Sequence, residues 1–480
     1  MMSRETKVLG ALALYAAAFL LYAVKWAFTW DESYHLVAAQ LIARGKRPYI
    51  DFCFPQTPVN AYWNAAWMRL LGENWRVPHA LAALFAIGAV LLTARFIFVR
   101  FPESSWRTAA ALSAALLTGL NAMVFIYGSV AQPYGICLFA LMIAFQLALR
   151  AVHRAALGWS VAVGFCAGIA AASSLLSAAG APVLIAWIMF YNRAGNRWIK
   201  LVTYCVGVAI PFAPVIWLFC QGPRQTVFNV IQYHAVFRKL YWPETTSHDF
   251  EVLTSWIESG QALLIGLLVL AGLVYIARRS LWPAAMKSEF YLCAWLAAAL
   301  SFEVSFAHPT FERYFLLAVP YLAILASVGL YAIASRVLDP DKPFWAVLLV
   351  VAILLIGLGR SLYDRLDIGD WSSYERLAKK VDEVTPRNAP LFADEPIYFL
   401  THRTPPPGLE LTYTHKIDLG PQENGLLHII PEAELKRQVQ SGMFATAYSC
   451  DSDEIRDYGL PNLYKNRVDM EECSIFWDRK

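Results

Sequence analysis

The feature that most limits how this chain can fold is the recurrence of long apolar runs along most of its length. Hydrophobic residues make up 58% of its 480 residues and charged residues only 16%, which is far too apolar for a soluble protein. Runs of roughly 17–22 residues have the length that an α-helix needs to cross a bilayer. We therefore expect an α-helical polytopic membrane protein with about eleven membrane-spanning helices, at residues 8–28, 79–99, 108–127, 135–151, 158–173, 177–191, 201–220, 260–277, 289–306, 314–335 and 344–362.

Basic residues in the short loops predict the orientation of these helices, because cytoplasmic loops carry an excess of Lys and Arg. With a cytoplasmic N-terminus every inner loop is basic, whereas the short outer turns at 128–134 and 174–180 contain neither residue. An odd number of spans then places the C-terminal tail outside the cytoplasm. The inner-loop bases are Arg100, Arg107, Arg150, Arg154, Arg193, Arg197, Lys200, Arg278, Arg279, Lys287, Arg336 and Lys342.

The chain divides by composition into two parts. Residues 1–362 form the expected transmembrane module, and its first outer loop, 30–78, contains apolar-periodic stretches that predict surface helices at 34–43 and 59–71. Residues 363–480 predict a small extracytoplasmic α/β domain, with helices at 371–384 and 434–440 and strands at 391–393 and 444–448. Cys450 and Cys473 of this domain would pair outside the cytoplasm or remain two thiols, and the sequence leaves both open.

Two adjacent carboxylates, Asp31 and Glu32, directly follow the first apolar run. Charges at a membrane exit are costly, so they indicate a function. A carboxylate there can act as a general base toward a hydroxyl or amine acceptor, or it can bind a metal. The alternative is that Asp31 or Ser33 caps the surface helix at 34–43, with Glu32 favoured by the dipole of that helix. Asp51, in the same loop, either complements this acidic pair or serves as a turn residue.

Basic and aromatic residues in the later outer loops are candidates for holding a phosphate. Arg313 and Tyr314 begin a late span, where a basic residue departs from the charge pattern of outer turns, and Arg binds phosphate in a bidentate manner. A membrane-interface anchor is the alternative. The second outer loop places His234, Arg238 and Lys239 among aromatic side chains, which suits a sugar and a lipid phosphate or a membrane-surface segment.

Several functional classes lack their motifs in this sequence. We find no CxxC, HExxH or EF-hand pattern, no Walker loop and no dinucleotide-binding glycine pattern. We therefore expect no cofactor, with metal dependence left open, and we expect neither a soluble nucleotide in a Gly-rich loop nor nucleic acid as a partner.

The order of these features resembles the GT-C glycosyltransferases, in particular the bacterial family 39 branch of protein O-mannosyltransferases and lipid A aminoarabinose transferases. The resemblance rests on the first outer loop and on the start of a late span, with an extracytoplasmic domain at the C-terminus. The matching residues are Asp31-Glu32, Tyr34, Gly45, Pro48, Asp51, Pro55-Gln56-Thr57-Pro58, Tyr62-Trp63, Gly72, Arg76 and Arg313-Tyr314. Many relatives carry a charged residue or His before the paired prolines of this loop, whereas the tract here, Phe54-Pro55-Gln56-Thr57-Pro58, has no charge.

The resemblance implies a glycosyltransferase of the bacterial cytoplasmic membrane that moves a sugar from a polyprenyl-phosphate donor to an extracytoplasmic acceptor, which is a lipid, glycan or protein. It implies Asp31 as the general base, with Glu32 and Asp51 beside it in the catalytic loop. It implies that Arg313 and Tyr314 bind the donor, with further donor candidates at Arg238, Lys239, His234 and Tyr62. The partners would be the lipid-linked donor, the acceptor and membrane lipid.

Three other classes remain as alternatives. A transporter or flippase would place charges in mid-membrane and often contains repeated halves. Here the acids and bases lie mostly at the expected outer interface, and the sequence contains no visible repeat. A polysaccharide ligase or polymerase of another fold would use the same lipid-linked substrates with a different order of loops. A non-catalytic membrane scaffold would have no need for the Asp31-Glu32 pair.

Overall fold

The computed structural model describes residues 4–278, 284–338, 342–366 and 369–480. Arg279, one of the expected inner-loop bases, lies outside the described residues. The chain forms two compact units, each assembled from segments that are distant in the sequence. The first unit consists of Met1–Ala27, His79–Pro214 and Glu244–Asp367, and the second consists of Phe28–Pro78, Val215–Pro243 and Ile368–Lys480.

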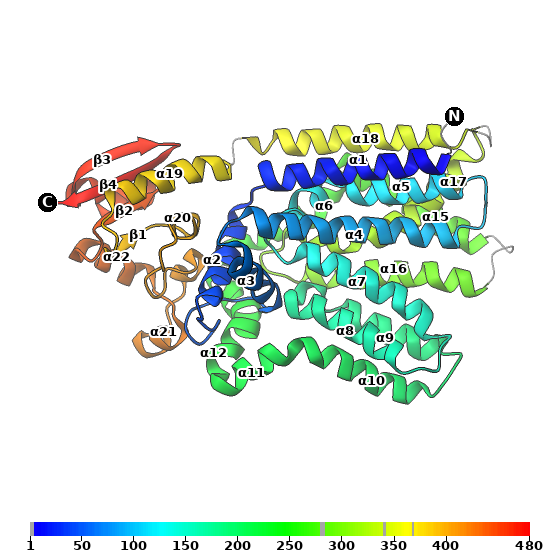
Figure 1. The fold of residues 1–480 in the computed structure, drawn as a ribbon, viewed down its shortest axis with the longest axis horizontal. Coiled ribbons are helices and arrows are strands. Elements are labelled where there is room, and N and C mark those ends of the chain that lie inside the picture. The colour runs from blue at the N-terminus through cyan, green and yellow to red at the C-terminus, as the bar shows by residue number, and fades with distance from the viewer. Residues whose placement is uncertain (1–3, 279–283, 339–341, 367–368) are drawn as a thin grey trace. The chain divides into compact units, whose positions relative to one another are not determined.

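The first unit is a bundle of helices (Figure 1). The apolar runs form these helices because a backbone surrounded by hydrocarbon must satisfy its hydrogen bonds internally. The helices are α1 (Arg4–Lys25), α4 (Arg76–Arg100), α5 (Arg107–Gly119), α6 (Ala122–Tyr127), α7 (Tyr134–Ala151), α8 (Gly158–Ser173), α9 (Gly180–Tyr191), α10 (Arg197–Ala209), α14 (Thr246–Thr254), α15 (Gly260–Arg278), α16 (Ala284–Ser305), α17 (Val319–Ala334) and α18 (Phe344–Tyr363), with short 3-10 segments η2 (Leu175–Ser177), η3 (Ile210–Phe212), η5 (Pro243–Thr245), η6 (Ser255–Ile257) and η7 (Glu312–Ala318).

Multiple membrane-spanning helices are confirmed, but the expected count of eleven is not. Within the described ranges, seven helical segments are long and apolar enough to cross a bilayer, and two shorter apolar helices, Gly158–Ser173 and Leu175–Tyr191, accompany them. The expected span at 108–127 is divided into α5 and α6, because the Asn121 side chain accepts hydrogen bonds from the backbone of Met123 and Val124 and starts a new helix. The seven are Val8–Lys25, Arg76–Arg100, Tyr134–Ala151, Arg197–Gln221, Gly260–Arg278, Glu312–Ala334 and Phe344–Tyr363.

Small residues let pairs of helices in this bundle approach closely. A Cβ on Gly329 of α17 would lie 1.8 Å from the Leu268 carbonyl oxygen of α15, and one on Gly164 of α8 would lie 2.1 Å from the Tyr204 carbonyl oxygen of α10. Only glycine fits at such contacts. Close approach of backbones at small residues is a usual source of packing energy between membrane helices. Helix α17 is almost entirely buried, whereas α18 exposes large apolar side chains such as Leu349 and Ile356.

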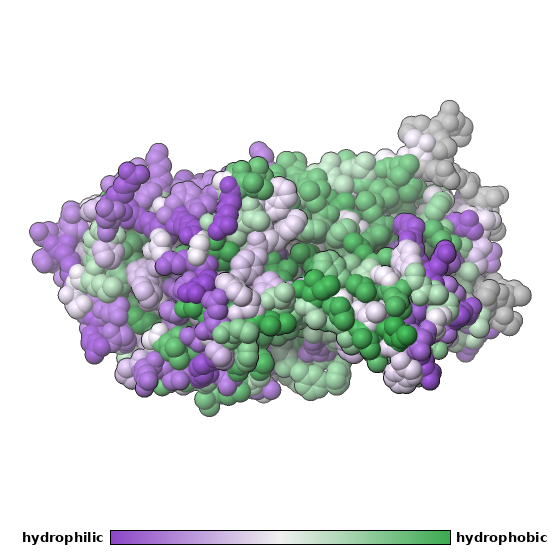
Figure 2. Space-filling view, turned by 60° about the horizontal axis from the view of Figure 1, so that its bottom comes forward, coloured by the Kyte–Doolittle hydropathy of each residue, from purple (hydrophilic) through white to green (hydrophobic). Residues whose placement is uncertain are grey.

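Hydrophobic side chains gather on the surface of the helical bundle, and hydrophilic ones on the surface around the C-terminal sheet (Figure 2). Exposed apolar area of this extent is tolerated where lipid rather than water is the solvent. The chain is therefore a multi-pass membrane protein, and the surface around its C-terminal sheet is more polar than that of the helical bundle.

The second unit combines the long loop after the first span (Phe28–Pro78), a second segment (Val215–Pro243) and the C-terminal tail (Ile368–Lys480). The surface helices expected at 34–43 and 59–71 are present as α2 and α3. The elements are η1 (Trp30–Glu32), α2 (Ser33–Ala43), α3 (Val59–Leu71), α11 (Ala213–Gln221), α12 (Pro223–Val227), the π-helix η4 (Phe228–Phe237), α13 (Arg238–Tyr241), α19 (Trp371–Val384), α20 (Glu395–Leu400), η9 (Thr412–Lys416), α21 (Pro421–Leu427), α22 (Glu432–Ser441), α23 (Ser452–Tyr458), α24 (Leu460–Leu463) and the strands β1 (Leu391–Phe392), β2 (Thr446–Ser449), β3 (Tyr464–Met470) and β4 (Cys473–Arg479).

The four strands form one sheet in the order β1-β2-β4-β3, in which only β1 and β2 are parallel. The strands expected at 391–393 and 444–448 correspond to β1 and β2, while β3 and β4 form an antiparallel hairpin that the sequence did not predict. A disulfide joins Cys450, just after β2, to Cys473 at the start of β4, which decides between the two states that the sequence left open. The predicted α/β character of the tail is confirmed.

Candidate functional site

The turn that carries the acidic pair is fixed by Glu32. Its carboxylate is fully buried, and its Oε1 accepts hydrogen bonds from the Thr29 backbone N–H at 3.2 Å and from the Trp371 indole N–H at 3.0 Å. A buried carboxylate that accepts two hydrogen bonds is stabilised in place. These contacts support a structural role for Glu32 that differs from the capping alternative, because its side chain makes no capping hydrogen bond to α2, and they hold the turn that carries Asp31.

Asp31 lies in η1, immediately before α2, and is half-buried. Its Oδ1 accepts a hydrogen bond of 2.8 Å from the hydroxyl group of Tyr413, which belongs to η9 in the C-terminal tail. A phenol that donates to a carboxylate makes a charge-assisted hydrogen bond, which holds the carboxylate in one orientation. The structure therefore presents Asp31 as a positioned and partly accessible carboxylate.

A neutral histidine lies beside this carboxylate. The ring of His35, on α2, stacks on Tyr34 with 4.2 Å between ring centroids. Burial lowers the pKa of His35 to about 3, although the nearby charge of Asp31 acts in the opposite direction. His35 is thus neutral at physiological pH and does not form an ion pair with Asp31.

Asp51 is engaged by a single arginine. Its carboxylate accepts hydrogen bonds from Nε and Nη2 of Arg47 at 3.0 and 2.9 Å, and from the Arg47 backbone N–H at 2.7 Å. The hydrogen bond from the Arg47 side chain lowers the pKa of Asp51 below its ordinary value. A carboxylate that is a weaker base and is held in a tight turn fits the turn-residue alternative better than a role in proton transfer.

The segment that contains the other donor candidates packs against the proline-rich turn of the first loop. His234, in η4, lies 2.6 Å through Nε2 from the carbonyl oxygen of Pro55, so this nitrogen carries the proton. Burial lowers the pKa of His234 to about 4, with the charge of Arg238 adding to the effect. Arg238 is half-buried, Lys239 is exposed, and Tyr62 is half-buried on α3.

A cluster of two arginines and aromatic rings occurs in the helical bundle. The guanidinium carbon of Arg313, in η7, lies 4.1 Å from the ring centroid of Phe311, 5.6 Å from that of Tyr314 and 5.7 Å from that of Tyr127. Arg365, just after α18, lies 5.4 Å from the same Tyr127 ring, and its Nη1 donates to the Tyr127 hydroxyl at 3.2 Å. Both arginines are half-buried, and they share one aromatic platform.

The loop that carries Arg313 is held by α14. Asp249 accepts a hydrogen bond from the Thr310 backbone N–H through Oδ1, and its Oδ2 lies 2.6 Å from Nδ1 of His308. The next residue along the loop, Phe311, packs against His248 with ring centroids 5.4 Å apart. These contacts fix the backbone directly before Arg313.

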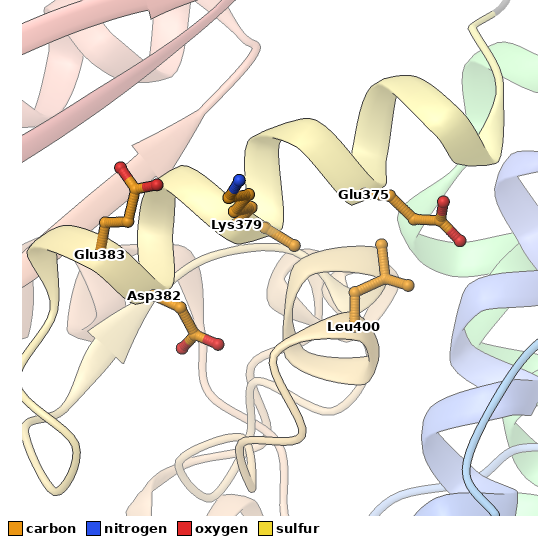
Figure 3. Close-up of a pocket in the computed structure, with 6 residues that line it drawn as sticks. Glu375, Lys379, Asp382, Glu383 and Leu400 are labelled. Carbon is orange, nitrogen blue, oxygen red and sulfur yellow. The ribbon is translucent and has the colours of Figure 1, made fainter.

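A separate surface pocket of about 490 Å³ lies beside α19 and is lined by Glu375, Lys379, Asp382, Glu383 and Leu400 among others (Figure 3). Its acids already have cationic partners. Glu375 pairs with Arg76, Asp382 with Arg403 and Glu383 with Lys380. We therefore do not assign a ligand to this pocket, and among the described residues no group of three or more His, Cys, Asp or Glu side chains could hold a metal ion.

The structure brings Asp31, Glu32 and Asp51 into the second unit with His234, Arg238, Lys239 and Tyr62, whereas Arg313 and Tyr314 belong to the first. Sequence reasoning missed Tyr413, Arg365 and Tyr127. Arg365 carried a usable signal, because it follows the last apolar run, where an outer interface is expected. Tyr413 carried no signal in the sequence, because 382 positions separate it from Asp31.

The overall fold is similar to that of known membrane proteins of the GT-C class. ArnT from Cupriavidus metallidurans matches in a structure bound to undecaprenyl phosphate, with 14% identity and a TM-score of 0.67 over 98% of both chains. Its apo structure matches with 15% identity and a TM-score of 0.66 over 99% of this chain and 98% of that one. The archaeal oligosaccharyltransferase AglB from Archaeoglobus fulgidus, in complex with an inhibitory peptide and a dolichol-phosphate, matches with 13% identity and a TM-score of 0.52 over 95% of this chain and 70% of that one.

No protein-family model and no curated protein matches the sequence. At these identities the structural matches establish the fold alone. The chain has the fold of the GT-C glycosyltransferases, and the resemblance seen in the sequence is confirmed at this level.

Proposed function

We propose that this protein is a glycosyltransferase of the bacterial cytoplasmic membrane, which transfers a sugar from a polyprenyl-phosphate donor to an extracytoplasmic acceptor. The observation that carries the proposal is the match along almost the full length of both chains to ArnT in a structure bound to undecaprenyl phosphate. The AglB structure bound to dolichol-phosphate supports the same class of donor. Both ligands are lipid phosphates, whose tails require a bilayer.

Asp31 is our candidate for the general base. As the acceptor hydroxyl or amine attacks the anomeric carbon of the donor sugar, the Asp31 carboxylate takes its proton, and the bond from the anomeric carbon to the phosphate oxygen breaks. The polyprenyl phosphate leaves already charged, so no strong general acid is required. Direct displacement of this kind inverts the anomeric configuration. The half-buried position of Asp31 and its hydrogen bond from Tyr413 support this role.

Arg313 and Arg365 are our candidates for binding the donor phosphate. Two guanidinium groups around the Tyr127 ring create a positive potential, and the planar fork of Arg suits the oxygens of phosphate. The Tyr314 ring centroid lies 5.6 Å from the guanidinium carbon of Arg313. Arg238, Lys239, His234 and Tyr62 remain candidates for contacts with the donor in the second unit.

A direct experiment tests the proposal. Membranes that contain the protein would be incubated with a panel of undecaprenyl-phosphate sugars labelled in the sugar, and the lipid, glycan and protein fractions would be examined for label. We expect transfer from at least one donor with the wild type and none with Asp31→Asn at equal protein level. Equal labelling by both proteins, or no labelling with any donor, contradicts the proposal.

A further inference from the structure

The hydroxyl group of Tyr413 connects the C-terminal tail to the carboxylate that we assign as the base. The phenol donates its hydrogen to Asp31 Oδ1 over 2.8 Å. The two residues are 382 positions apart, and both belong to the second compact unit. A hydrogen bond between such distant segments persists only if each end is held independently.

The position of Tyr413 is fixed by a buried acid. Glu395, at the start of α20, is almost fully buried, and its Oε1 accepts hydrogen bonds from both the backbone N–H and the hydroxyl of Thr412, at 2.7 and 2.9 Å. Thr412 directly precedes Tyr413 in η9. These two hydrogen bonds determine where η9 begins and hence where the Tyr413 ring lies.

The same helix, α20, also contacts the element that follows Asp31. Helix α2 begins two residues after Asp31, and Gln40 of α2 donates from Nε2 to the Phe399 carbonyl oxygen of α20 at 3.1 Å. Helix α20 therefore supports both ends of the hydrogen bond: α2 and Asp31 on one side, Glu395, Thr412 and Tyr413 on the other. Supporting contacts of this kind hold a functional group, here the Asp31 carboxylate, in one geometry.

We propose that Tyr413 is a positioning residue for the general base, so that the C-terminal tail is part of the catalytic apparatus. The inference rests on the proposed function of Asp31. In this account the hydrogen bond from Tyr413 to Oδ1 holds the Asp31 carboxylate in the orientation in which it takes the proton of the acceptor.

The test compares Tyr413→Phe with the wild type in sugar transfer. We expect kcat to fall on the order of 10-fold with KM for donor and acceptor unchanged, as for the loss of one hydrogen bond to a charged group. Tyr464→Phe is the matched control: it removes a phenol hydrogen bond to the Phe444 carbonyl in the same domain and should leave kcat and KM unchanged.

A second measurement does not depend on activity. A double-mutant cycle with Asp31→Asn and Tyr413→Phe on thermal unfolding should show that the two changes are coupled. If Tyr413→Phe matches the wild type in kcat while Asp31→Asn is inactive, Tyr413 does not position the base. If Asp31→Asn itself is fully active, the proposed function of Asp31 fails instead. Additive effects of the two changes on unfolding overturn the hydrogen bond from which the inference starts.

Discussion

Replacement of Arg313 by alanine should weaken binding of the lipid donor without unfolding the protein. Loss of one charge-assisted hydrogen bond to phosphate costs about 1.5–3 kcal/mol, which corresponds to a rise in Kd of about 10- to 150-fold. The guanidinium also lies 4.1 Å from the Phe311 ring centroid, a contact that contributes about 0.5–1 kcal/mol to stability at a partly exposed site. Binding and stability therefore have to be measured separately.

The assay is the affinity of undecaprenyl phosphate for the purified protein in detergent, with thermal unfolding recorded on the same samples. Arg313→Lys should recover only part of the affinity, because an ammonium group keeps the charge but loses the planar fork. Arg365→Ala should weaken binding in the same direction. Arg360→Ala is the control for helix α18, since the Arg360 side chain is 84% exposed. Unchanged affinity in Arg313→Ala would mean that this arginine anchors the protein at the membrane interface and does not bind the donor.

Three further predictions concern other residues. Asp31→Asn should lower transfer on the order of 10²- to 10⁴-fold at unchanged protein level, since an amide cannot accept the proton, and near-normal turnover in membranes would refute the assignment. Reduction of the Cys450–Cys473 disulfide, which closes a loop with a sequence separation of 23, should destabilise the C-terminal domain by about 3 kcal/mol, and thermal unfolding that does not respond to dithiothreitol would contradict this. Burial raises the pKa of Glu410 to about 8. The native state therefore keeps a proton that the unfolded state releases above its ordinary pKa, so stability should fall between about pH 4.5 and 8, and Glu410→Gln should reduce this slope in unfolding measurements at several pH values.

Features encoded in local patterns could be predicted from the sequence. The stretches at 34–43 and 59–71 have helical periodicity, and they form α2 (Ser33–Ala43) and α3 (Val59–Leu71). The helix expected at 371–384 coincides with α19 for the same reason. The GT-C resemblance also rested on a local signal, since its most specific residues all lie in the first outer loop.

Features that depend on distant contacts could not be predicted. The pairing of β3 with β4 was missed, because polar strands such as Tyr464–Met470 lack a clear alternation of apolar residues. The separate role of Glu32 within the acidic pair depends on Trp371, which is 339 positions away. The proposed roles of Tyr413 and Arg365 likewise depend on contacts with distant residues, namely Asp31 and Tyr127.

The central claim, sugar transfer from a lipid phosphate, is tested most directly in proteoliposomes that contain the purified protein and an undecaprenyl-phosphate sugar labelled in the sugar, together with an extract of envelope acceptors. The measurement follows both the covalent destination of the label and the release of free undecaprenyl phosphate. The account predicts that label appears on an acceptor in equal amount to the lipid phosphate released, and that both require Asp31. Movement of the intact lipid-linked sugar across the bilayer without release of undecaprenyl phosphate would contradict the account and identify a flippase.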